Sequence, residues 1–214
     1  MFEKSVEELT ELGAQITTAE IAQQPELWRD TLNIYRENKE AIEAFLAEAR
    51  AMGEGRLSVV FTGAGTSDYV GDTCAPYLRH AGNTDLYDFK PIATTDIVSA
   101  PRDFLRAEDP TLVVSFARSG NSPESLAAVA VAKELVHNVK FLNITCAPEG
   151  KLAVESADDP NALTLLIPRA NDKGFAMTGS YTCMTLLSTL IFDEASDEQK
   201  AEWVETIAKM GEEV

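Results

Sequence analysis

The first 55 residues carry the spacing of apolar side chains that is typical of α-helices. Between residues 28 and 49, apolar positions recur three or four residues apart, and charged positions lie largely opposite them. This apolar face comprises Trp28, Leu32, Tyr35, Ile42, Phe45, Leu46 and Ala49. Pro25 suits the first turn of the helix, where no backbone N–H is needed, and Gly53 and Gly55 end it. Thr17 or Thr18 is expected to cap a short turn before it. We therefore predict an N-terminal helical segment at residues 1–55.

From residue 57 onward, short apolar runs alternate with longer stretches of helical spacing. The runs have the length and the flanking turn residues of buried strands; they lie at 57–61, 86–92, 111–116, 139–145 and 162–167. Helices are predicted at about 67–80, 123–137, 175–193 and 197–212. Strands that alternate with helices form right-handed crossovers and hence a parallel sheet. Residues 56–214 are therefore predicted to form one α/β domain, with a five-stranded, doubly wound, flavodoxin-like parallel sheet.

Two of the predicted strand-to-helix turns are rich in glycine and hydroxyl groups. The first reads GAGTS at 63–67, and the second reads SFARSGNSPES at 115–125. The carboxyl ends of parallel strands share one edge of the sheet, so the two following helix N-termini should meet there. Free N–H groups and the positive end of each helix dipole favour phosphate at such a place. The predicted phosphate-binding residues are Gly65, Thr66, Ser67, Ser115, Arg118, Ser119, Asn121 and Ser122.

Ordinary helix starts account for part of this pattern. A tight turn with a capping hydroxyl explains GTS alone, and Ser122 with Pro123 is a common start of a helix. Arg118 is the sole cation of the second stretch; it could bind phosphate, or it could be a surface arginine in an ion pair. A dinucleotide-binding site is disfavoured, because Asp68 stands where the G-x-G-x-x-G pattern needs glycine, and no G-K-[S/T] follows.

A third turn, NDKGFAMTGSYT at 171–182, has the same strand-to-helix setting. Asp172 is a candidate acid or base, and Lys173 is a candidate electrostatic partner. The alternative is an Asn-Asp turn without chemistry. Thr178 and Ser180 could face the same pocket or bond to the preceding turn.

Charge and composition narrow the classes of partner. A net charge of −17 argues against nucleic acid and against an anionic membrane, but not against a small anion, since salt screens charges beyond about 10 Å. Cys74, Cys146 and Cys183 have no C-x-x-C spacing, and an odd number of cysteines fits a reducing compartment. No apolar run approaches the length of a membrane span, and no secretory signal is evident. We expect a cytoplasmic protein that holds no metal or cofactor.

The two hydroxyl-rich turns resemble those of the sugar isomerase (SIS) domain. The longer stretches GAGTSDYVGD, SFARSGNSPES, ATTDIVS and NDKGFAMTGSYT are similar to the tagatose-6-phosphate ketose/aldose isomerase family, which includes galactosamine-6-phosphate deaminases. That family is related to the isomerase half of glucosamine-6-phosphate synthase. The resemblance extends from about residue 20 over most of the chain.

The resemblance implies an enzyme that acts on a hexose or amino-sugar 6-phosphate. It would move a proton between C1 and C2 of the open-chain sugar, with or without loss of ammonia, and without a metal or redox cofactor. Thr66, Ser67, Ser115, Ser119 and Ser122 would hold the phosphate. Asp172 falls near a glutamate of the synthase relatives and would serve the proton transfer.

Members of this family usually carry two SIS domains in a chain nearly twice as long. The alternative expectation is therefore a phosphosugar-binding module without chemistry, or a single domain of a two-domain enzyme; nucleotide binding is a weaker third reading. We also expect a homodimer, because the apolar faces of the long N-terminal helix and of the last helix exceed what one sheet needs for its cover.

Overall fold

Three helices precede the sheet and confirm the predicted N-terminal helical segment. The computed structural model describes residue 2 and residues 4–213, so residues 1, 3 and 214 of the predicted ranges lie outside the described residues. The helices are α1 (Val6–Glu11), α2 (Gln15–Ala22) and α3 (Gln24–Arg50). Pro25 lies in the first turn of α3, as predicted. Thr17 and Thr18 cap no turn, because both lie inside α2.

Five parallel strands form a single sheet in the order β2-β1-β3-β4-β5, which confirms the predicted doubly wound α/β fold. The strands are β1 (Leu57–Gly63), β2 (Tyr87–Pro91), β3 (Thr111–Ala117), β4 (Val139–Thr145) and β5 (Ala162–Leu166). The chain winds outward from β1 in one direction and from β3 in the other, so the topological switch point lies between these two strands. In their register Gly63 is opposite Phe116, so the turns after β1 and β3 begin side by side.

The remaining helices include three that the sequence did not predict. The helices are α4 (Asp68–Ala81), α5 (Thr94–Ser99), α6 (Pro101–Phe104), α7 (Pro123–Leu135), α8 (Lys151–Ser156), α9 (Gly179–Phe192) and α10 (Asp197–Glu212). Helices α5, α6 and α8 have six residues or fewer, which is too short for a helical period to show. Short 3-10 turns lie at Gly65–Ser67 and Pro168–Ala170.

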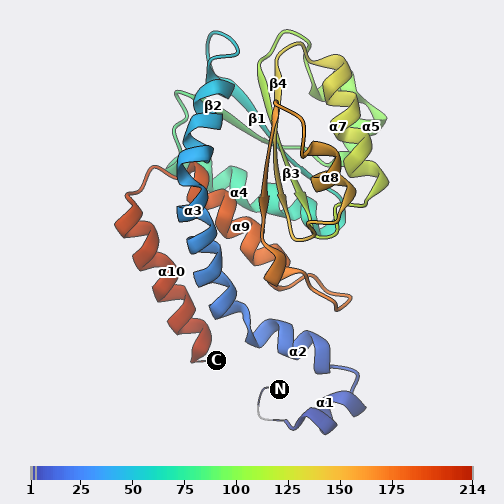
Figure 1. Cartoon of the computed structure of the whole chain (residues 1–214), viewed down its shortest axis with the longest axis vertical. Helices are drawn as coiled ribbons and strands as arrows, with labels where there is room; N and C mark the ends of the chain where they lie inside the picture. The colour runs from blue at the N-terminus through green and yellow to red at the C-terminus, as the bar shows by residue number, and fades with distance from the viewer. Residues whose placement is uncertain (1, 3, 214) are drawn as a thin grey trace.

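Alternate residues of the strands pack against helices on opposite faces of the sheet. Phe61 and Leu112 belong to a core shared with α3, α4 and α9. Val60 and Val113 belong to a second core shared with α5 and α7. Helix α10 packs outside α3 and adds a further layer (Figure 1). Residues of α3 share this core with the sheet, so the core continues across the predicted domain boundary at residue 55. The boundary stays a prediction.

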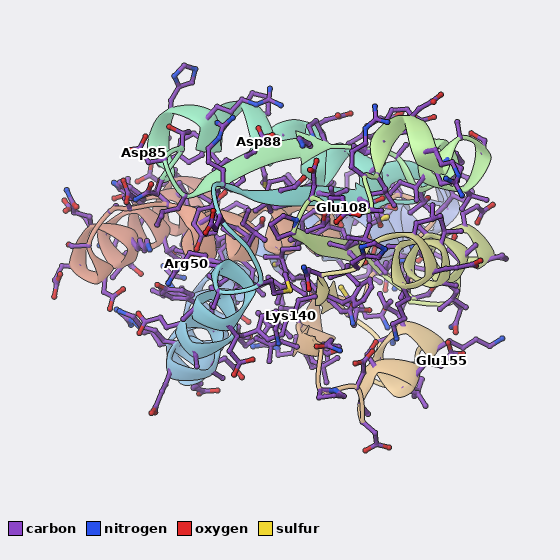
Figure 2. All side chains as sticks on the ribbon, turned by 90° about the horizontal axis from the view of Figure 1, so that it is seen from above. Arg50, Asp85, Asp88, Glu108, Lys140 and Glu155 are labelled. Carbon is purple, nitrogen blue, oxygen red and sulfur yellow. The ribbon has the colours of Figure 1, made fainter. Side chains whose placement is uncertain are left out.

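The two ends of the sheet have different neighbours. The amino ends of the strands lie near the end of α3, where Arg50 donates to the Tyr87 hydroxyl and Lys140 donates to Glu48. Figure 2 looks onto this end, with Arg50 and Lys140 labelled. The carboxyl ends point the other way, toward α2 and the loop between β5 and α9 (Figure 1). The predicted site residues follow the carboxyl ends.

Candidate functional site

The turn after β1 depends on two glycines. A Cβ on Gly63 would lie 2.4 Å from the carbonyl carbon of Ser67, so only glycine lets the turn fold back so closely. Gly65 has φ +59°, a conformation that favours glycine. Gly65 and Thr66 are exposed at the edge of the sheet, whereas Ser67 is buried and its hydroxyl lies 3.9 Å from the Met177 sulfur. This turn therefore presents Thr66 at the switch point and directs Ser67 toward the loop before α9.

The turn after β3 also presents hydroxyls at this edge. Gly120 has φ +65°, Ser119 is exposed, and Ser122 is half-buried. Ser122 occupies the N-cap position of α7, but its side chain donates to the Glu124 carboxylate (2.9 Å) and makes no bond to the helix backbone. Hydrogen bonds from its own backbone N–H and from Ser122 lower the pKa of Glu124. The first turn of α7 thus has no side-chain cap of its own.

The first residues of α8 fix the shape of the turn after β3. Asn121 accepts a hydrogen bond from the Lys151 N–H (3.1 Å), and the Gly120 carbonyl accepts from the Leu152 N–H (3.0 Å). A Cβ on Gly150 would lie 2.3 Å from the Ser119 carbonyl oxygen. Asn121 is therefore engaged in fixing the shape of this turn.

Ser115 lies inside β3 and below the exposed hydroxyls. It is 3% exposed and stands opposite Thr62 of β1 and Asn143 of β4 in the register of the sheet. The hydroxyls of Ser115, Thr62 and Ser125 are buried without a partner among the described residues. These hydroxyls form a polar layer behind the exposed edge.

Asp172 caps the first turn of α9. Its carboxylate is 5% exposed and accepts five hydrogen bonds of 2.5–3.1 Å. The donors are the backbone N–H groups of Thr178, Gly179 and Ser180 and the hydroxyls of Thr178 and Ser180. The structure thus brings the predicted residues of the third turn together, with Asp172 at their centre, while Lys173 is exposed. Its role in proton transfer stays a prediction.

Two contacts tie the third turn to the rest of the molecule. Arg118 donates through Nη1 to the Gly174 carbonyl oxygen (3.1 Å), so it faces the β5–α9 loop. Glu20 of α2 accepts hydrogen bonds from the N–H groups of Lys173 and Gly174. The sequence analysis did not select Glu20 as a site residue, because the residues that it contacts are more than 150 positions away.

The cysteines are poor candidates for chemistry. All three are free and buried, and burial raises the pKa of Cys74 and of Cys183 to about 11 and raises that of Cys146 as well. Thiols with such pKa values stay protonated near neutral pH, and a protonated thiol is a weak nucleophile and metal ligand. Within residues 2 and 4–213, no group of three or more His, Cys, Asp or Glu side chains is arranged to hold a metal ion. No helix in that part of the chain is long and apolar enough to cross a membrane.

Comparisons with known proteins relate this arrangement to one family. The family model for the SIS domain matches residues 55–192. The D-galactosamine-6-phosphate deaminase AgaS of Shewanella sp. (strain ANA-3) is 43% identical over 189 residues, which are 88% of this chain and 48% of that protein. A Streptomyces coelicolor protein, provisionally named as the same deaminase, is 47% identical over 188 residues. These residues make up 87% of this chain and 47% of the length of that protein.

A solved structure shows the same fold at a similar level of identity. It is a Clostridium novyi protein, provisionally named a tagatose-6-phosphate ketose/aldose isomerase, with 43% identity and a TM-score of 0.89. The match covers 98% of this chain and 53% of that one. The chain therefore spans about half the length of the curated relatives that it matches.

Proposed function

Because the chain belongs to the SIS-domain family, we propose that it binds a hexose or amino-sugar 6-phosphate and takes part in its aldose–ketose isomerisation, with or without loss of ammonia. One observation carries the proposal. Two glycine-dependent turns, rich in hydroxyls, leave neighbouring strands at the topological switch point of the sheet.

In this proposal the two turns hold the phosphate through neutral donors. Thr66, Ser67, Ser119 and Ser122 supply hydroxyls, and Ser122 turns from Glu124 to a phosphate oxygen. Gly65 and Gly120 allow the backbone to approach the ligand closely. Ser115 and Asn121 support the second turn from behind. Neutral donors add no charge of their own, and the cation Arg118, which also donates to the Gly174 carbonyl, stands beside them.

The anchored phosphate positions C1 and C2 of the open-chain sugar for proton transfer. Remote binding energy of this kind lowers the barrier by fixing the reacting atoms. Asp172 is the proposed acid or base of this chain, since it follows the carboxyl end of β5 in the same parallel sheet. Its carboxylate oxygens already accept five hydrogen bonds, so some of these must be released before an oxygen can reach a proton of the sugar. No cofactor takes part in the proposed chemistry.

The second candidate function is a phosphosugar-binding module without turnover. The Asp172 carboxylate favours it, because its bonding capacity is already used by five donors at the start of α9. Incubation with galactosamine 6-phosphate and with tagatose 6-phosphate, coupled to detection of ammonia and of the interconverted sugar, separates the two. Turnover supports the enzyme. Binding without turnover at any protein concentration supports the module and contradicts the enzyme.

We also propose that the protein forms a homodimer in the reducing environment of the cytoplasm. Trp203, Ile207 and Met210 form an exposed apolar stripe at helical spacing along the outer face of α10. An exposed apolar stripe of this kind is stabilised by burial against a second copy. Three free, buried cysteines are consistent with a reducing compartment.

A further inference from the structure

We propose that Glu20 is a positioning residue, which holds the loop at residues 171–178 against the carboxyl edge of the sheet and so makes α2 part of the site. The inference rests on the proposed phosphosugar function and deepens it. It concerns a side chain outside the predicted site and outside the region matched by the family model.

The contact between Glu20 and the loop is charged and buried. One carboxylate oxygen, Oε1, accepts hydrogen bonds from two successive N–H groups, those of Lys173 (2.5 Å) and Gly174 (3.0 Å). Glu20 itself is 7% exposed. Hydrogen bonds to a charged acceptor are roughly twice as strong as those between neutral groups. Glu20 therefore fixes the backbone of the loop from the side of α2.

Gly174 is held from both sides. Its N–H binds the Glu20 carboxylate, and its carbonyl oxygen accepts a hydrogen bond from Arg118 (3.1 Å). A Cβ on Gly174 would lie 2.7 Å from Glu20 Oε2, so an alanine here would require the Glu20 carboxylate to shift. Arg118 immediately precedes Ser119 in the turn after β3. Gly174 therefore connects Glu20 of α2 to that turn.

The loop borders the first phosphate turn as well. The Met177 sulfur accepts a hydrogen bond from the Ser67 hydroxyl (3.9 Å). Asp172, at the start of the loop, caps α9. The side chain of Phe175, at the middle of the loop, is fully exposed. The loop thus forms a wall beside both turns, where the carbons of a sugar held by its phosphate would lie.

The stability of the fold does not by itself account for a buried carboxylate at Glu20. The second oxygen of Glu20, Oε2, is buried without a partner among the described residues. A buried acceptor that forms no hydrogen bond is unfavourable for folding. A carboxylate at this position is instead suited to fixing two adjacent N–H groups of a loop.

Hydrogen exchange of single amides tests the contact itself. In Glu20→Ala, the amides of Lys173 and Gly174 should exchange at least tenfold faster than in the wild type. Glu20→Gln keeps a side-chain carbonyl oxygen that accepts from both N–H groups, so it should restore most of the protection. Glu40→Ala, a change at an exposed glutamate of α3, serves as the matched control and should leave both amides unchanged. Gly174→Ala, which displaces Glu20 from the other side, should reproduce the loss and replaces Glu20→Ala if that variant is unfolded.

Calorimetric binding of two ligands tests the positioning role. Inorganic phosphate contacts the two turns alone, whereas tagatose 6-phosphate also reaches the loop. Glu20→Ala should leave the affinity for inorganic phosphate within twofold of the wild type and weaken tagatose 6-phosphate at least fivefold, with rescue in Glu20→Gln.

Each outcome bears on one claim. Unchanged exchange in both Glu20→Ala and Gly174→Ala overturns the contact, whatever the function of the chain. Faster exchange with unchanged binding of both ligands overturns the positioning role and leaves the proposed function standing. If the wild type fails to bind tagatose 6-phosphate, the proposed function fails, and the exchange measurement alone decides whether Glu20 fixes the loop.

Discussion

At the scale of the residue, the polar side chains at the sheet edge differ in how far their bonding capacity is already used. Asp172 accepts five hydrogen bonds, Asn121 binds the Lys151 N–H, and Ser122 binds Glu124. Ser119 and Thr66 are exposed. The groups with the least competition are hydroxyls, which suits binding of an anion better than it suits acid–base catalysis.

Asp172→Asn separates a capping role from a catalytic one. The asparagine amide cannot accept all five hydrogen bonds, and its NH2 group would face the backbone N–H groups that Asp172 now binds. The free energy of unfolding should therefore fall by about 1–3 kcal/mol. If Asp172 also transfers the proton, kcat should fall by about 10²- to 10⁴-fold while the substrate still binds. Chemical denaturation and turnover assays measure the two effects, with the exposed Asp158→Asn as control.

A stability loss with an unchanged kcat, in protein shown to be folded at the assay temperature, would remove Asp172 from the reaction and leave it as the cap of α9.

The sequence predicts which residues lie at the edge better than what they bind there. The hydroxyl-rich turns stand out because glycine and serine follow apolar strands. The partners of Asp172 and Glu20 do not stand out, since they depend on the path of the loop after β5. Glu20 contacts residues 153 and 154 positions away, and no local pattern signals such a contact.

At the scale of the element, length decided which predictions succeeded. All five strands and the four longer helices predicted from residue 57 onward are present, because their apolar periods run over several turns or alternations. The short helices α5, α6 and α8 carry no readable period. Helix α9 begins at Gly179 rather than near residue 175, because Asp172 binds the N–H groups of residues 178–180 and ends the loop there.

Helix α10 is held against α3 by ion pairs as well as by apolar contacts. Arg29 donates to Glu205 (2.9 Å) and to Glu212, and Lys39 donates to Asp197. Hydrogen bonds from these cations lower the pKa of all three carboxyl groups. These side chains are 32–50% exposed and therefore screened by water and salt, so each pair adds little by itself.

Acid should therefore weaken this junction. A carboxyl group with a lowered pKa in the folded state contributes stability above its unfolded value, here 3.8 for Asp197 and 4.5 for the glutamates, and loses it as pH falls further. We expect the free energy of unfolding to fall from about pH 5 to pH 3, and to fall less steeply in the double variant Arg29→Met/Lys39→Met. Urea denaturation at a series of pH values measures this, with the exposed Lys151→Met as control. Equal pH dependence in the wild type and the double variant would contradict it.

At the scale of the whole molecule, the described residues form one sheet with helices on both faces, and the chain spans about half the length of the curated relatives that it matches. The fold class followed from the alternation of strands and helices, which topology rules reduce to few arrangements. The assembly does not follow from one chain. The apolar stripe on α10 is the feature that makes self-association testable.

Charges placed on the stripe should disrupt a dimer. Light scattering should give about twice the 23.3 kDa chain mass for the wild type at micromolar concentration, and the monomer mass for Trp203→Glu/Met210→Glu. Lys209→Glu changes the net charge by the same amount on another side of α10 and should stay dimeric. A wild type of monomer mass would refute the dimer.

The central claim is that the turns after β1 and β3 hold the phosphate of a hexose 6-phosphate. Calorimetric titration with tagatose 6-phosphate and with unphosphorylated tagatose tests it most directly, in the wild type and in Ser119→Ala/Ser122→Ala. We predict that the wild type binds only the phosphorylated sugar. The double variant should lose at least tenfold in affinity, because each lost hydrogen bond to a charged oxygen costs about 1.5–3 kcal/mol. Its melting temperature should stay unchanged. Equal affinity for both sugars, or an affinity for tagatose 6-phosphate that the double variant retains, would contradict the account.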